Sequence, residues 1–178
     1  MKHHGCSIVT PPGCSKKGVL GPKGRQVDLF VDADNQSCLA GWAVCSFLQA
    51  HGHQIRRAVI AGNAIGRKQN HGWRGWLKDF DVPEVETFSV PVRKDSADVR
   101  LILALGTYME HPPGPDTLVL VLSRDNVLVE TARVLSDSGV AVMVACNRQP
   151  SLPQNTQVPV LAVDLGQCRK RLKLAKAA

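Results

Sequence analysis

The stretch that decides the fold reads Val27-Asp28-Leu29-Phe30-Val31-Asp32-Ala33-Asp34-Asn35. Its apolar centre is typical of a buried strand, and two acids and an amide follow at its carboxyl end. In an open parallel sheet, ligand sites are built at that end. Clustered carboxylates there indicate a divalent metal held by oxygen ligands. Acids and amides after a strand also cap helices, so this stretch alone leaves both interpretations open.

The composition is typical of a globular protein, with 44% hydrophobic and 21% charged residues among 178. That length predicts one main domain with a core of its own. No apolar run reaches the length of a membrane span, and we expect no secretory signal at the N-terminus. The six cysteines lie mostly in apolar segments, which favours reduced thiols and a cytoplasmic location.

The charge is strongly basic. Lysine and arginine number 22 against 15 aspartates and glutamates, a formal net charge of +7. An excess of this kind favours a polyanionic partner, with nucleic acid first. The alternative is that the positive charge only aids solubility.

Strand and helix patterns alternate along the chain, which predicts an α/β sandwich with a mostly parallel sheet. We expect strands around 29–31 and at 57–61, 85–92, 117–122, 140–145 and 158–163, the last at a sheet edge. Helices are expected at 37–51, 95–110 and 127–138. The domain is placed at residues 26–165, between a basic flexible tail at 1–25 and a basic tail or helix at 166–178.

A loose, glycine-containing segment after the second strand combines basic residues with tryptophans. Its candidate nucleic-acid-binding residues are Arg67, Lys68, Trp73 and Arg74. Such a mixture suits contacts to phosphate and stacking on unpaired bases. The alternative is a short amphipathic helix at 73–80 with its tryptophans in the core, and both interpretations can hold together.

Three acids stand at comparable places. Asp32 ends the first strand, Asp125 follows the 117–122 strand, and Asp98 opens a helix. If the first strand neighbours the 117–122 strand, these carboxylates converge on one pocket. Like charges in one pocket raise each other's pKa unless a cation offsets them, and Mg²⁺ or Mn²⁺ is the natural cation for carboxylates and water.

Helix capping is the alternative for these acids. It explains one acid per helix well. It does not explain two acids in each of the stretches Asp32-Ala33-Asp34-Asn35 and Asp95-Ser96-Ala97-Asp98.

Three ordered motifs carry a family resemblance. They are Phe30-Val31-Asp32-Ala33-Asp34-Asn35, an apolar strand ending in Asp-x-x-Asn; Lys94-Asp95-Ser96-Ala97-Asp98, which opens a helix; and Leu120-Val121-Leu122-Ser123-Arg124-Asp125, a strand ending in Ser-x-Asp. In this order they resemble the PIN-like ribonucleases, and within them the NYN group. The resemblance runs from about residue 27 to residue 146.

The resemblance implies a Rossmann-like, PIN-like three-layer sandwich and metal-dependent endoribonuclease activity with Mg²⁺ or Mn²⁺. Asp32, Asp98 and Asp125 carry over as the catalytic and metal-binding acids. The candidate supporting residues are Asn35, Asp34, Asp95, Ser123 and Asn126. Further candidates for holding phosphate are Arg93, Lys94 and Arg124, beside the acids. The expected partner is single-stranded or looped RNA, without a membrane, and a homodimer stays open.

Two departures from the family pattern matter. Relatives often have a further acid two residues after the third aspartate, where this chain has Val127, and another on the second helix, where it has Ala104 and Leu105. These departures keep open a non-catalytic RNA-binding adaptor on the same fold. A response-regulator-like domain would need a lysine where a later strand ends in Cys146 and Asn147. A dinucleotide-binding enzyme is disfavoured because no Gly-x-Gly-x-x-Gly follows the first strand.

Overall fold

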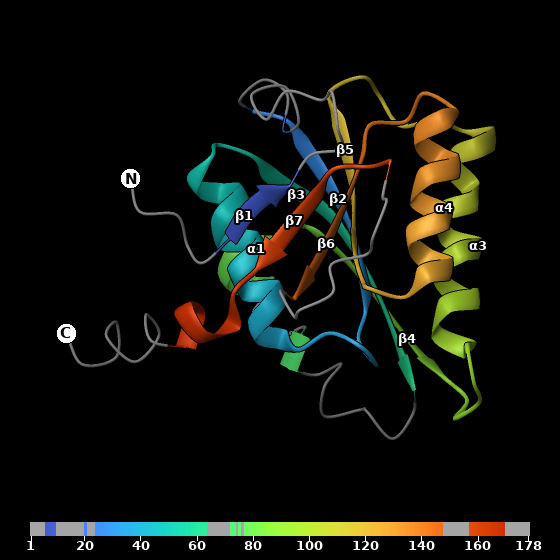
Figure 1. The fold of residues 1–178 in the computed structure, drawn as a ribbon, viewed down its shortest axis with the longest axis horizontal. Coiled ribbons are helices and arrows are strands. Elements are labelled where there is room, and N and C mark those ends of the chain that lie inside the picture. Colours follow the sequence, from blue (N-terminus) through green and yellow to red (C-terminus); the bar gives the residue numbers. More distant parts are fainter. Residues whose placement is uncertain are drawn as a thin grey trace.

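The computed structural model describes residues 6–9, 20, 24–63, 72, 73, 75, 77–147 and 157–169. Within these residues, seven strands form one sheet in the order β1-β7-β6-β5-β2-β3-β4 (Figure 1). The strands are β1 (Cys6–Val9), β2 (Gln26–Asp32), β3 (Gln54–Asn63), β4 (Glu84–Val90), β5 (Thr117–Leu122), β6 (Val142–Asn147) and β7 (Val160–Val163). The helices are α1 (Cys38–Ala50), η2 (Lys78–Phe80), α3 (Ser96–Glu110) and α4 (Asn126–Asp137).

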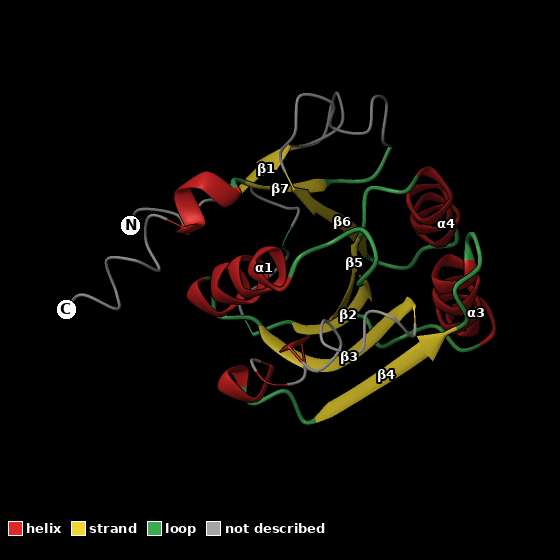
Figure 2. Cartoon of the chain, turned by 90° about the horizontal axis from the view of Figure 1, so that it is seen from below, coloured by secondary structure: helices red, strands yellow, loops and turns green. Residues whose placement is uncertain are grey.

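Helices cover both faces of the sheet and make three layers. Figure 2 shows α1 on one face, with α3 and α4 side by side on the other. Alternation along β2 serves both layers: Leu29 and Val31 join the core under α1, while Phe30 joins the core under α3 and α4. All six residues of β5 are buried, as expected of an inner parallel strand. The predicted α/β sandwich with a mostly parallel sheet is therefore confirmed.

The strand order changes direction between β2 and β5. The chain runs from β2 through α1 to β3 and on to β4, and α3 then returns it to β5 on the other side of β2. Strand β2 is parallel to both β3 and β5. The carboxyl ends of β2 and β5 thus meet at a topological switch point, the place where open α/β sheets bind ligands.

Strand β1 lies within the segment predicted to be a tail. It pairs antiparallel with β7, from Cys6 opposite Val163 to Val9 opposite Val160. Strand β7 is therefore an inner strand, and the prediction of a sheet edge at 158–163 is wrong. A four-residue strand next to glycines and prolines is too short for its alternation to stand out in the sequence. The rest of residues 1–19 lies outside the described residues.

Residues 165–169 are helical, and residues 170–178 lie outside the described part of the chain. Within the described residues, no helix is long and apolar enough to cross a membrane. Among the described residues, Cys6, Cys38, Cys45, Cys146 and Cys168 form no disulfide bond.

A buried ionic contact holds α3 against the sheet. The Asp28 carboxylate on β2 is fully buried. It accepts a hydrogen bond from Arg56 Nε at 3.0 Å and another from the Tyr108 hydroxyl at 2.5 Å. Tyr108 lies near the end of α3, so this contact fixes the helix whose first turn carries Asp98.

Candidate active site

Asp32 is the last residue of β2 and is 1% exposed. Its Oδ2 accepts hydrogen bonds from Asn35 Nδ2 at 2.7 Å and from Ser123 Oγ at 2.8 Å. Its Oδ1 accepts a third from the Asn35 backbone N–H at 3.2 Å. Burial raises the pKa of Asp32, and the hydrogen bonds from Asn35 and Ser123 oppose that rise. The carboxylate is held in one orientation at the switch point.

Ser123 connects the end of β2 with the start of α4. While it donates to Asp32, its Oγ accepts the backbone N–H of Asp125 at 3.0 Å. Asp125 is the N-cap of α4, and its Oδ1 accepts the Val127 backbone N–H at 3.0 Å. Asp125 therefore caps a helix, as the alternative interpretation predicted, and Ser123 links its backbone to the Asp32 carboxylate.

Asp98 is not a helix cap. The N-cap position of α3 belongs to Asp95, which has a left-handed backbone with φ 61° and makes no side-chain capping bond. Asp98 lies in the first turn and is 6% exposed, and its Oδ1 has no hydrogen-bond partner within the described residues. Burial raises the pKa of Asp98 to about 6, and the charges of Asp32 and Asp125 add to the rise. The charges of the other two predicted acids therefore reach Asp98.

These acids fit a cation better than an empty site. A buried carboxylate oxygen that lacks a hydrogen-bond partner and feels two further negative charges destabilises the folded protein, unless a positive charge offsets it. Among the residues that the structure describes, however, no three His, Cys, Asp or Glu side chains lie close enough to form a metal site by themselves. Water would have to complete the coordination, which is common for Mg²⁺.

A family model for the NYN domain matches residues 26–158. The chain belongs to the NYN domain family. This family is PIN-like, so the resemblance seen in the three motifs is confirmed. No curated protein matches the chain.

A crystal structure of a Vibrio parahaemolyticus protein of unknown function resembles this NYN domain. The TM-score is 0.51 at 16% identity, over 81% of this chain and 96% of that chain. At that identity the likeness concerns the fold alone.

The supporting residues of the NYN domain differ in exposure. Asp34 is exposed, and its Oδ1 accepts the backbone N–H of Asn63 at 2.9 Å, which ties the loop after β2 to the end of β3. Asp95 is exposed at the N-cap of α3, and Asn126 is exposed at the first position of α4. Only Asn35 and Ser123 bond directly to one of the three acids among the contacts described.

Three candidate phosphate-binding residues are close in sequence to Asp98 and Asp125. Arg93 and Lys94 are exposed just before α3, and Arg124 is exposed between Ser123 and Asp125. Trp73 is fully buried in the core under α1, so the prediction that it stacks on a base is not supported. Its apolar ring is more stable against the sheet than in water. Arg67, Lys68 and Arg74 lie outside the described residues.

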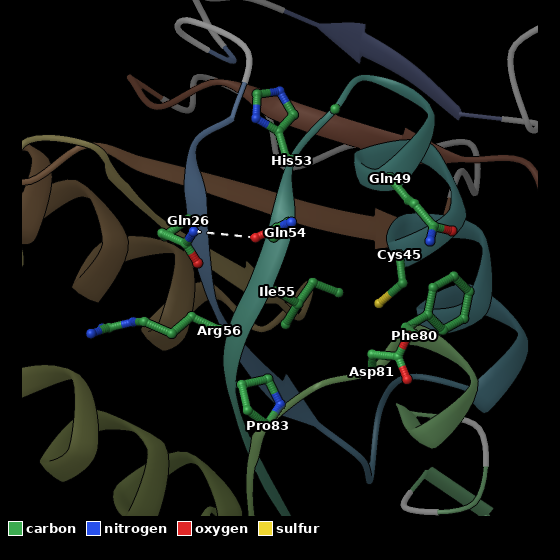
Figure 3. Close-up of a pocket in the computed structure, with 11 residues that line it drawn as sticks. Gln26, Cys45, Gln49, His53, Gln54, Ile55, Arg56, Phe80, Asp81 and Pro83 are labelled. Atoms are coloured by element: carbon green, nitrogen blue, oxygen red, sulfur yellow. Dashed lines mark hydrogen bonds between the residues drawn. The ribbon is translucent and has the colours of Figure 1, made fainter.

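Two cavities lie at opposite ends of β2. The first, of about 420 Å³, is lined by Gln26 and Gln54 at the starts of β2 and β3, whose side chains share a hydrogen bond of 3.4 Å (Figure 3). The second, of about 310 Å³, lies at the carboxyl end, where Asp34, Asn35 and Gln36 line it. Gln36 directly follows the Asp-x-x-Asn motif, but no sequence pattern singles it out as a site residue.

Proposed function

We propose that this NYN domain is a metal-dependent endoribonuclease that hydrolyses RNA phosphodiester bonds at Asp32, Asp98 and Asp125. The observation that carries the proposal is the buried Asp98 carboxyl, which lacks a hydrogen-bond partner among the described residues and is acted on by the charges of the two other acids. Buried, mutually repelling acids at a switch point are characteristic of functional sites. Membership of a PIN-like nuclease family supports the same chemistry.

The chain's own residues have separable tasks. Asn35 and Ser123 hold the Asp32 carboxylate in one orientation through hydrogen bonds to its Oδ2. The Oδ1 of Asp125 accepts the backbone N–H of Val127 in α4, and its Oδ2 takes no part in that hydrogen bond. A bound Mg²⁺ or Mn²⁺ would activate water for attack on phosphorus and offset the charge that develops there. Exposed Arg93, Lys94 and Arg124 would hold the phosphates of the substrate.

Replacing Asp125 with asparagine tests the proposal. Asp125→Asn removes the charge and keeps a side chain that caps helices well, so the fold should be preserved. Cleavage of a single-stranded RNA in Mg²⁺ or Mn²⁺ should fall by roughly two orders of magnitude or more. RNA binding should be unchanged or tighter, because a negative charge facing phosphate has gone. Gel assays with and without EDTA provide the measurement.

Asp137→Asn, at the exposed far end of α4, is the matched control and should cleave normally. Normal cleavage by Asp125→Asn would show that Asp125 is only a cap. Wild-type cleavage that persists in EDTA would show that the metal mechanism is wrong.

A non-catalytic RNA-binding protein is the second candidate. The observation that favours it is Val127, which is 44% exposed in the first turn of α4, where relatives often place an acid. With fewer acids, a site can keep its shape and its basic surroundings while its affinity for a metal falls. This candidate predicts that the wild type binds RNA and does not cleave it in Mg²⁺ or Mn²⁺.

A further inference from the structure

The second cavity lies between the end of β2 and the start of α1, and we call it the α1 hollow. Its walls include Ala33, Asp34, Asn35, Gln36 and Trp73. It adjoins the acids directly, because Asn35 lines the hollow and also donates two hydrogen bonds to Asp32. A ligand group in the hollow would therefore lie next to the proposed cleavage site.

Gln36 is the unexplained residue of this hollow. It is 4% exposed, and within the described residues neither Nε2 nor Oε1 of its side chain has a hydrogen-bond partner. Its backbone is fixed, because its N–H donates to the Asp32 carbonyl at 3.0 Å. Buried amides are nearly always hydrogen-bonded, and leaving both ends of one without a partner destabilises the fold. A side chain kept at such a cost is characteristic of a functional site.

We propose that the α1 hollow binds one nucleobase of the RNA, beside the scissile phosphate, and that the Gln36 amide pairs with its edge. This inference rests on the proposed ribonuclease function. An amide offers one acceptor and two donors, and nucleobase edges present donors and acceptors side by side. Gln36 would thereby make the nuclease prefer some bases over others at one position.

A base suits the hollow better than a phosphate does. Asp34 supplies a carboxylate that would repel a phosphate, and no lysine or arginine is among the described residues that line the hollow. Ala33 and the buried Trp73 supply apolar wall. Rotation about the side-chain torsions of Gln36 would turn its amide from its present buried position toward the ligand.

Gln36→Leu tests the inference, since leucine keeps an apolar stem and removes the amide. The probes are sets of four short single-stranded RNAs. Within a set, the RNAs differ only in the base at one position, and successive sets vary successive positions. Their affinities are measured in EDTA, and their cleavage is measured in Mn²⁺. We expect the wild type to prefer some bases at one position by about five- to tenfold. Gln36→Leu should bring all four within about twofold.

Thermal unfolding separates this role from a structural one. Removing a buried amide that makes no hydrogen bond in the described part of the chain should leave the melting temperature of Gln36→Leu unchanged or higher. Gln49→Leu is the matched control, because Gln49 lies near the end of α1, away from the α1 hollow, and lines the other cavity (Figure 3). It should keep the base preference of the wild type.

The outcomes that overturn the base site differ from those that overturn the nuclease. Wild-type protein that cleaves RNA without any base preference would refute the base site and leave the ribonuclease standing. An unchanged preference in Gln36→Leu, or a lower melting temperature, would do the same. Wild-type protein that neither binds nor cleaves any of the RNAs would refute both.

Discussion

Ser123 shows how one hydroxyl can set the properties of a neighbouring acid. Its hydrogen bond lowers the pKa of Asp32 against the larger opposing effect of burial. Ser123→Ala should therefore raise that pKa and move the acidic limb of the pH–rate profile to higher pH. On the plateau, cleavage should fall about tenfold, as for the loss of one charge-assisted hydrogen bond. The measurement is kcat/KM against pH in Mn²⁺.

Ser138→Ala is the control for this experiment, because Ser138 donates to the Val134 carbonyl at the other end of α4. Its pH profile should match that of the wild type. If Ser123→Ala loses the same factor at every pH, Ser123 does not act through the charge of Asp32.

Asp98 links the site to folding stability. Its pKa of about 6 in the folded protein lies above its ordinary value of 3.8, so protonation favours the folded state. This contribution is complete below pH 3.8 and is lost as the pH rises through 6. In EDTA, Asp98→Asn should therefore be more stable than the wild type at about pH 8, and this advantage should shrink toward about pH 4. Urea unfolding at both pH values measures the difference.

The same unfolding experiment can be repeated with Mn²⁺ in place of EDTA. Mn²⁺ should raise the stability of the wild type at neutral pH, because it binds the folded state alone. It should raise the stability of Asp98→Asn much less. Equal stabilisation of both proteins would place the ion away from Asp98.

At the scale of the elements, α3 contributes Asp98 to the candidate site from its first turn and packs into the core through Tyr108 near its other end. Tyr108 near its end donates to buried Asp28 and packs edge-on against Phe30 at 5.8 Å. Tyr108→Phe keeps the packing and removes the hydroxyl, leaving Asp28 with Arg56. We expect a loss of about 1–3 kcal/mol in the free energy of unfolding, measured in urea.

Met109→Leu, half exposed on the same turn of α3, is the matched control and should change the stability little. Cleavage by Tyr108→Phe at saturating RNA should stay near the wild-type rate, since Asp28 lies at the opposite end of β2 from Asp32. Unchanged stability would mean that the Tyr108–Asp28 contact contributes nothing to holding α3.

At the scale of the whole molecule, the parts predicted from sequence were those set by local pattern. Apolar runs that are followed by acids identified β2 and β5, and the adjacency of these strands in the sheet brings Asp32 next to Ser123. Trp73 was ambiguous, because a tryptophan among basic residues suits either a base or a core. Asp98 and Gln36 have buried side-chain atoms without hydrogen-bond partners among the described residues, and this depends on what other elements bring near, which no local pattern records.

The net charge of +7 belongs to the molecule as a whole and does not say which basic residues contact RNA. Phosphate contacts release counterions, so the affinity for single-stranded RNA should fall steeply with added salt. If Arg93 and Lys94 each contact a phosphate, replacing both with alanine should reduce the log–log salt slope by about 1.4. Binding is measured in EDTA by fluorescence anisotropy over a salt series.

The matched control replaces two positive charges away from the acids, half-buried Arg25 and exposed Lys78. Arg25 directly precedes β2, and Lys78 lies in η2, whose Phe80 lines the first cavity, at the amino end of β2. Arg25→Ala with Lys78→Ala lowers the net charge by the same amount, so it separates overall charge from location. The control should keep the wild-type slope, because counterion release depends on direct phosphate contacts. Equal slopes in the two double variants would mean that RNA does not run past the first turn of α3, where Asp98 lies.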